Sequence, residues 1–97
     1  MSVKVIGLME LTDPSAFAEY REQVSQTVEQ YKGLIYVRGV VTEIFWNELN
    51  CNLFSAYVEL NFPSHEDAHA WANSPQYQSL VPIRNRAMRL TLFSVTI

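Results

Sequence analysis

The sequence contains little of what marks a specialised class of protein. Cys51 is the single cysteine among 97 residues, so no disulfide can form within the chain. No apolar run approaches the roughly 18 residues that a membrane helix needs. The first residues also lack the apolar core of a secretory signal peptide. These features predict a cytoplasmic protein without a membrane partner.

Positive charge is also scarce. Seven lysines and arginines stand against ten acidic residues, the formal net charge is −3, and the basic residues form no run. Because a nucleic-acid-binding surface needs a basic patch or stripe, no nucleic-acid partner is expected. The composition, 48% hydrophobic and 18% charged, is that of a globular protein. The length predicts one domain over residues 1–97.

The first third of the chain predicts a strand followed by a helix. Residues 3–11 are apolar and partly β-branched, as in strands. Asp13 and Pro14 then suit the cap and the first turn of a helix. An apolar stripe at steps of three and four residues continues to Tyr31. Gly33 is expected to end this helix in the left-handed conformation.

The middle of the chain predicts a β-hairpin. Residues 34–46 are rich in β-branched and aromatic residues and predict a long strand, with a bulge at Gly39. Residues 47–52 are polar and predict the connection. Apolar residues alternate strictly over much of 53–62, which predicts a third strand with one apolar face.

The last third predicts a helix, a short extra helix and a final strand. Ser64 and Ser74 are each placed to cap a helix, and a proline follows Ser74 at the first helical position. Pro82 is expected to interrupt the short helix. Residues 88–97 are again β-branched and apolar and predict the fourth strand.

The resulting order is β-α-β-β-α-β, which is the ferredoxin-like α+β arrangement with helices on one face of a four-stranded antiparallel sheet. A sheet with one face in water shows polar residues at every second position. Here Ile6 and Leu8 oppose Val3 and Val5 in the first strand, so both faces are largely apolar. The helices can cover one face, and a second copy of the chain is expected on the other, as a homodimer.

Four groups of residues occur in the order of one known family. They are Thr12-Asp13-Pro14 with Phe17 and Tyr20, Val37-Arg38-Gly39, Phe62-Pro63-Ser64 with Ala68 and Trp71, and Ser74-Pro75-Gln76-Tyr77-Gln78 with Arg84. The chain resembles the domain of unknown function 1330 family, of the dimeric α/β-barrel superfamily. The resemblance implies the fold and a homodimer. It implies no particular chemistry, since related members include cofactor-independent monooxygenases, isomerases and haem enzymes.

The chain also departs from the family pattern. Lys32 replaces the first glycine of a pair, Val40 replaces a glycine after Arg-Gly, and Phe45-Trp46-Asn47 stands where a glycine usually ends the strand. The chain is therefore identified as a divergent member, whose pocket is expected to be reshaped near Trp46.

Five residues are candidates for a binding site. Arg38 interrupts an apolar strand, and a buried cation needs a partner. That partner could be Glu59, in an ion pair at the dimer interface, or a carboxylate or enolate oxygen of a small ligand. Trp71 and Tyr77 could wall a pocket between helix and sheet, or simply pack in the core. Arg84 could join them or complement a helix dipole.

Metal and cofactor motifs are lacking. His65 and His69 are four residues apart on a predicted helix and could share a face, but solvent-exposed or capping roles suit them better than a metal pair. Cys51 is interpreted as a spare loop thiol, and no cofactor is expected.

One hypothesis for the function is a cofactor-independent enzyme or binder of a small organic acid. The alternative is a non-catalytic homodimeric structural or regulatory module, so the sequence leaves enzymatic activity open.

Overall fold

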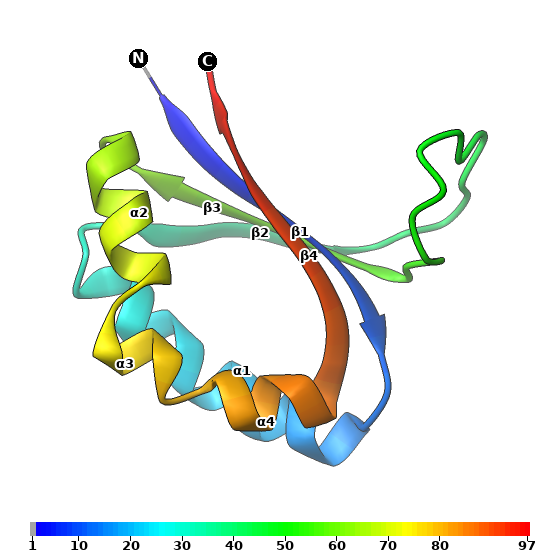
Figure 1. The fold of residues 1–97 in the computed structure, drawn as a ribbon, viewed down its shortest axis with the longest axis horizontal. Coiled ribbons are helices and arrows are strands. Elements are labelled where there is room, and N and C mark those ends of the chain that lie inside the picture. Colours follow the sequence, from blue (N-terminus) through cyan, green and yellow to red (C-terminus); the bar gives the residue numbers. More distant parts are fainter. Residues whose placement is uncertain (1) are drawn as a thin grey trace.

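The fold is a four-stranded sheet with helices packed on one of its faces (Figure 1). The computed structural model describes residues 2–97. The strand order is β2-β3-β1-β4, and every neighbouring pair is antiparallel. The elements are β1 (Val3–Leu11), α1 (Pro14–Glu29), β2 (Leu34–Val40), β3 (Ala56–Phe62), α2 (His65–Ala72), α3 (Pro75–Gln78), α4 (Val81–Ala87) and β4 (Met88–Thr96). The predicted ferredoxin-like α+β fold is confirmed.

The predicted caps begin three of the helices. Side-chain oxygens of Asp13, Ser64 and Ser74 accept backbone N–H groups in the first turns of α1, α2 and α3. Pro82 does not simply interrupt a short helix, as expected, but lies in the first turn of a further helix, α4, where its missing N–H costs nothing. No helix within residues 2–97 combines the length and apolar character needed to cross a membrane.

The end of α1 differs from the prediction. Lys32, and not Gly33, adopts the left-handed conformation, with φ of 68°. The N–H groups of Lys32 and Gly33 donate to the carbonyls of Glu29 and Val28, which is a Schellman ending. Gly33 is needed for a steric reason instead, because a Cβ there would lie 2.5 Å from a ring atom of Phe62.

The β2–β3 connection is longer than the sequence predicts. β2 ends at Val40 and β3 begins at Ala56, so residues 41–55 form a loop that projects beyond the sheet in Figure 1. Phe45 and Trp46, which were expected in the strand, are 73% and 81% exposed in this loop. The prediction failed because β-branched and aromatic composition favours a strand only where a partner strand is in place.

The bulge in β2 also lies at another position. The β2–β3 register shifts between Ile35 and Val37, so Tyr36 is the extra residue and the expectation at Gly39 was wrong. After the shift, Arg38 lies opposite Val58. Directly opposed residues in an antiparallel pair point to the same face. The bulge therefore sets which face of the sheet Arg38 occupies.

One face of the sheet, covered by the helices, forms the core. Val3 pairs with Phe62 and Val5 with Leu60, and all four side chains are 3–4% exposed. The opposite, open face carries residues that the helices do not cover. By register these include Lys4, Ile6, Leu8, Val37, Tyr57, Glu59, Asn61, Phe93 and Val95. The expectation of a second apolar face holds only in part, since Lys4, Glu59 and Asn61 form a hydrogen-bonded polar group within it.

Candidate functional site

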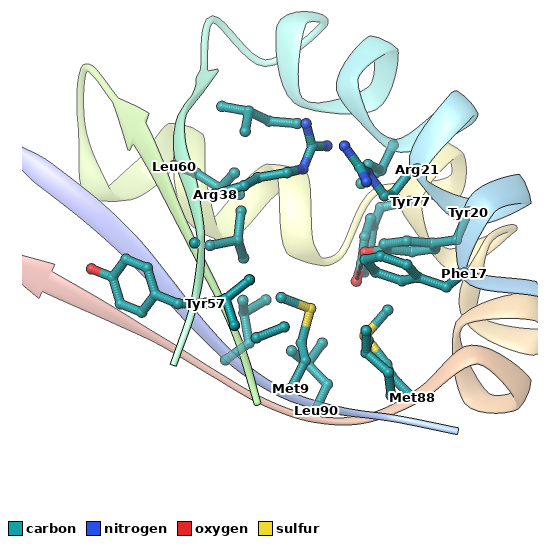
Figure 2. A pocket seen from close by; sticks show the side chains of 18 of the residues that line it. Met9, Phe17, Tyr20, Arg21, Arg38, Tyr57, Leu60, Tyr77, Met88 and Leu90 are labelled. Atoms are coloured by element: carbon teal, nitrogen blue, oxygen red, sulfur yellow. Dashed lines mark hydrogen bonds between the residues drawn. The ribbon is translucent and has the colours of Figure 1, made fainter. Parts of the chain in front are cut away.

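A cavity of about 260 Å³ lies between α1 and the helix-covered face of the sheet. Figure 2 shows Met9 and Leu60 of the sheet on one side and Phe17 and Tyr20 of α1 on the other. The lining is mostly apolar and is drawn from α1 and every strand, with Met9, Val24, Ile35, Val58, Leu60 and Leu90 among its members. Such a cavity suits the apolar body of a small molecule.

Two arginines supply the positive charge of the cavity. Arg38 of β2 and Arg21 of α1 both line it, and Figure 2 shows their guanidinium groups directed towards one another. Arg21 also lies over the ring of Phe17, one turn earlier, at 5.6 Å. Both ion pairs within residues 2–97 involve other side chains. Partial burial lowers the pKa of Arg38, and the charge of Arg21 lowers it further. This arrangement favours a bound anion.

A chain of hydrogen bonds reaches the cavity from α4. Arg84 donates from Nη1 to the hydroxyl oxygen of Tyr77 at 3.0 Å. The hydroxyl oxygens of Tyr77 and Tyr20 are 2.9 Å apart, and both tyrosines line the cavity. Burial raises the pKa of Tyr20 well above its usual range, with a further contribution from Tyr77. The Tyr20 hydroxyl is therefore neutral and can donate a hydrogen bond.

Trp71 forms part of the wall, and its indole N–H has a partner within the protein. The ring packs against Tyr77 and Phe62, with centroids 4.5 and 5.6 Å away. The indole N–H donates to the Thr27 hydroxyl at 3.0 Å, and that hydroxyl donates to the Val24 carbonyl at 2.7 Å. Trp71 therefore shapes the cavity through its apolar surface.

Glu59 is the sequence candidate that lies away from the cavity. Its carboxylate is on the open face, where it forms an ion pair with Lys4 at 2.9 Å and accepts a hydrogen bond from Tyr57 at 3.0 Å. The hydrogen bond from Lys4 is the main cause that lowers the pKa of Glu59. The expected pairing of Arg38 with Glu59 was wrong, because the bulge at Tyr36 places Arg38 on the helix-covered face. Of the other candidates, Arg38, Trp71 and Tyr77 line the cavity and Arg84 contacts Tyr77.

Comparison with known proteins yields a family and no activity. The family model described as Domain of unknown function (DUF1330) matches residues 3–96. The chain belongs to this family. This match confirms the resemblance to the DUF1330 family that the sequence motifs indicated. Among curated proteins, no match is found.

Solved structures similar to this DUF1330 chain confirm its fold. A protein of unknown function from Rhodopseudomonas palustris is 16% identical with a TM-score of 0.78, covering 99% of this chain and 82% of that one. SnoaB, a cofactor-independent oxygenase from Streptomyces nogalater, is 10% identical with a TM-score of 0.68, covering 99% and 92%. A dimeric ferredoxin-like protein of unknown function from a Jannaschia species is 10% identical with a TM-score of 0.68, covering 100% of both chains.

Sequence reasoning missed two residues of this cavity. They are Tyr20 and Arg21, and neither was among the five candidates for a binding site. The available indication for Arg21 was its place four residues after Phe17, where a helical guanidinium can lie across an aromatic ring. Tyr20 offered no comparable indication, because its hydroxyl partner Tyr77 is 57 residues away in the chain.

The remaining reactive side chains lie outside the cavity lining. His65 and His69 are both on α2 of this DUF1330 chain, with ring centroids 6.1 Å apart. Within the described range 2–97, no three His, Cys, Asp or Glu side chains are grouped to hold a metal ion. Cys51 is a free thiol in the loop 41–55. Trp46 of the same loop is also absent from the lining, so the expected reshaping of the pocket near Trp46 does not occur in this cavity.

Proposed function

We propose that the chain binds a small organic acid in the cavity between the sheet and α1. The observation on which the proposal depends is the pair formed by Arg21 and Arg38, two guanidinium groups at an apolar cavity without a carboxylate partner in the described chain. The partial burial of Arg38 and its repulsion by the charge of Arg21 cost free energy, which a bound anion offsets. An acid with an apolar body matches both the charge and the walls.

The size of the cavity limits the ligand. A volume of about 260 Å³ is just under the range of about 300–1,000 Å³ that is typical of pockets for drug-sized molecules. The rings of Tyr20, Trp71 and Tyr77 contribute to the walls, and aromatic walls favour a flat ring between them. We therefore expect one or two rings, or an apolar chain of similar bulk.

The side chains that face the cavity favour binding over acid–base catalysis. Within residues 2–97 the ionisable groups facing it are Arg21, Arg38, Tyr20 and Tyr77, since Tyr57 points away in Figure 2. A guanidinium stays protonated, and burial keeps Tyr20 neutral, so neither is a general base at neutral pH. We therefore expect any reaction here to draw its proton acceptor from the ligand or from solvent. The likeness to SnoaB, a cofactor-independent oxygenase, supports a reaction of that kind at the level of fold alone.

We also propose that the chain forms a homodimer through the open face. Val37 and Phe93 are 41% and 43% exposed on that face, and the helices cover only the other one. The dimeric description of the Jannaschia protein supports this proposal. A non-catalytic homodimeric module would need the open face and would have no use for unpaired arginines at a cavity. The arginines therefore favour ligand binding in a dimer over a purely structural dimer.

Isothermal titration calorimetry with matched acids and amides tests the binding proposal. Benzoate, 2-naphthoate and biphenyl-4-carboxylate are each compared with the corresponding carboxamide, which has the same shape and no charge. We expect at least one acid to bind about tenfold or more tightly than its amide, because hydrogen bonds to charged groups are the stronger ones. The variant Arg38→Gln should lose most of this preference, and the double variant with Arg21→Gln should lose all of it.

Arg86→Gln provides the matched control. Arg86 is exposed on α4 and does not line the cavity, so this variant has the same charge change at another place. Its preference for acids should equal that of the unaltered chain. The proposal is wrong if no acid in the series outcompetes its amide, or if Arg86→Gln reduces the preference as much as Arg38→Gln.

A further inference from the structure

The hydroxyl groups of Tyr20 and Tyr77 have two protons to donate, but only one of these protons has an acceptor. Their oxygens are 2.9 Å apart and share one hydrogen bond, which uses one of the two O–H protons. The other contact of the pair is with Arg84, whose guanidinium is a donor without acceptor atoms. Within residues 2–97 neither hydroxyl has any further hydrogen-bond partner. One hydroxyl proton is therefore left without an acceptor.

Arg84 determines which tyrosine keeps that proton. A hydroxyl that accepts a hydrogen bond from a cation becomes a stronger donor, so we assign the donor role to Tyr77 and the acceptor role to Tyr20. The free proton then belongs to Tyr20. In the opposite order it would belong to Tyr77, which is 2% exposed against 8% for Tyr20 and so is less open to any acceptor.

We propose that the ligand is an oxo acid, whose carbonyl oxygen accepts the Tyr20 proton while its carboxylate binds Arg21 and Arg38. This inference rests on the proposed function and adds a second anchor to it. In this arrangement Tyr20 determines specificity by touching the ligand. The Tyr77 hydroxyl and Arg84 have a positioning role, because they affect the ligand's carbonyl oxygen only through the Tyr20 hydroxyl, although the Tyr77 ring is also part of the cavity wall.

In the cavity, the Tyr20 hydroxyl discriminates between ligands with and without an acceptor more strongly than it would in water. A ligand without an acceptor leaves the buried O–H unpaired, and an unpaired buried donor costs free energy. Burial raises the pKa of Tyr20, so the proton is retained at neutral pH. Figure 2 shows the Tyr20 ring reaching the cavity from the helix side, opposite Met9 and Leu60 of the sheet.

The test compares 3- and 4-acetylbenzoate with 3- and 4-isopropenylbenzoate, which have nearly the same shape and lack the carbonyl acceptor. In the unaltered protein, calorimetry should show at least one acetyl compound binding about five- to tenfold more tightly than its isostere. Tyr20→Phe should remove this preference and leave the preference for acids over amides unchanged. Circular dichroism melting confirms that each variant is folded.

The positioning residues give outcomes that a purely structural role does not predict. Tyr77→Phe should retain most of the preference for the acetyl compound, because the Tyr20 hydroxyl is then free to donate. Arg84→Met should reduce the preference by less than Tyr20→Phe does, and Arg84→Lys should restore part of it. If Tyr20→Phe fails to fold, the two Arg84 variants provide the same comparison.

Two results would overturn the inference. One is equal binding of both acetyl compounds and their isosteres by the unaltered protein. The other is a loss in Tyr77→Phe as large as in Tyr20→Phe, which would point to a general disturbance of the cavity. If acids still bind more tightly than amides in either case, the proposed function stands and only the oxo-acid assignment fails.

Discussion

Arg38 lies directly opposite Val58 in the β2–β3 ladder, so its side chain shares the face of the sheet that the helices cover. Glu59, the next residue of β3, points to the open face and pairs with Lys4. Neighbouring residues in a strand face opposite sides, so a single bulge decides whether the cation and the carboxylate meet. Because they do not meet, the cavity keeps a positive charge that no carboxylate among residues 2–97 neutralises.

Replacing either cavity arginine should leave the protein as stable as before or slightly more stable. Arg38→Gln removes one of two like charges, and we expect the free energy of unfolding to rise by up to about 0.5 kcal/mol. Arg21→Gln also removes the contact with the Phe17 ring, so we expect no net change in that variant. Urea denaturation measures it. Lys4→Gln is the comparison, since it breaks the ion pair with Glu59 and should lower stability by about 0.2–1 kcal/mol. A marked loss in Arg38→Gln would mean that the arginine has a structural partner.

The two glycines at either end of β2 should respond differently to alanine. Gly33→Ala places a Cβ 2.5 Å from the Phe62 ring, which is buried in the core and cannot easily move. We expect a loss of about 1–3 kcal/mol in urea denaturation. Gly39→Ala is the control, because nothing lies within 4 Å of its added Cβ, and it should change stability by less than about 0.5 kcal/mol. Similar losses in both variants would contradict the steric explanation.

The raised pKa of Tyr20 predicts a loss of stability at alkaline pH. In the unfolded chain a tyrosine ionises near pH 10.0, whereas the buried Tyr20 keeps its proton. The unfolded state therefore loses a proton that the folded state holds, so stability is complete below pH 10 and falls as pH rises above it. In Tyr20→Phe, the free energy of unfolding should decrease less steeply above pH 10, by about 1 kcal/mol per pH unit. Tyr36→Phe, whose ring is 63% exposed, should retain the fall of the unaltered protein.

A charge on the open face should separate the proposed dimer. Phe93 lies opposite Ile6 on that face and is 43% exposed in the single chain. Phe93→Lys would place an unpaired cation within the interface, so sedimentation should show monomers at concentrations where the unaltered chain is dimeric. Gln26→Lys, on the exposed side of α1, adds the same charge elsewhere and should leave the dimer intact. A monomeric unaltered chain at high micromolar concentration would refute the dimer.

Much of the fold could be predicted from local pattern. β1 has the predicted bounds, β4 begins at the predicted residue, and Asp13, Ser64 and Ser74 cap their helices, because capping and alternation depend on residues close in sequence. The predictions failed where the structure of a segment depends on another segment that is distant in the sequence. β2 ends at Val40 because its partner strand begins only at Ala56, and no local pattern shows where pairing stops.

The sequence predicted several residues of the candidate site, but it did not predict how they are arranged. Arg38 stood out as a cation in an apolar strand, and Trp71 and Tyr77 as aromatic residues beside a helix. Their meeting with Tyr20 and Arg21 was not visible, because α1 and α3 contribute tyrosines 57 residues apart to one hydrogen bond. Hydrophobic periodicity indicates which side of a helix or strand is apolar, but it does not indicate which elements pack against each other.

By itself the sequence determined the four strands and their order, the caps of α1, α2 and α3, and the family of the chain, since these depend on side-chain chemistry within a few residues. Only the tertiary structure decided that Arg38 faces the helices and that the hydroxyls of Tyr20 and Tyr77 meet at the cavity. A register shift of one residue at Tyr36 and the packing of α1 on the sheet set both facts. Each is a relation between distant segments, which folding establishes when it brings them together.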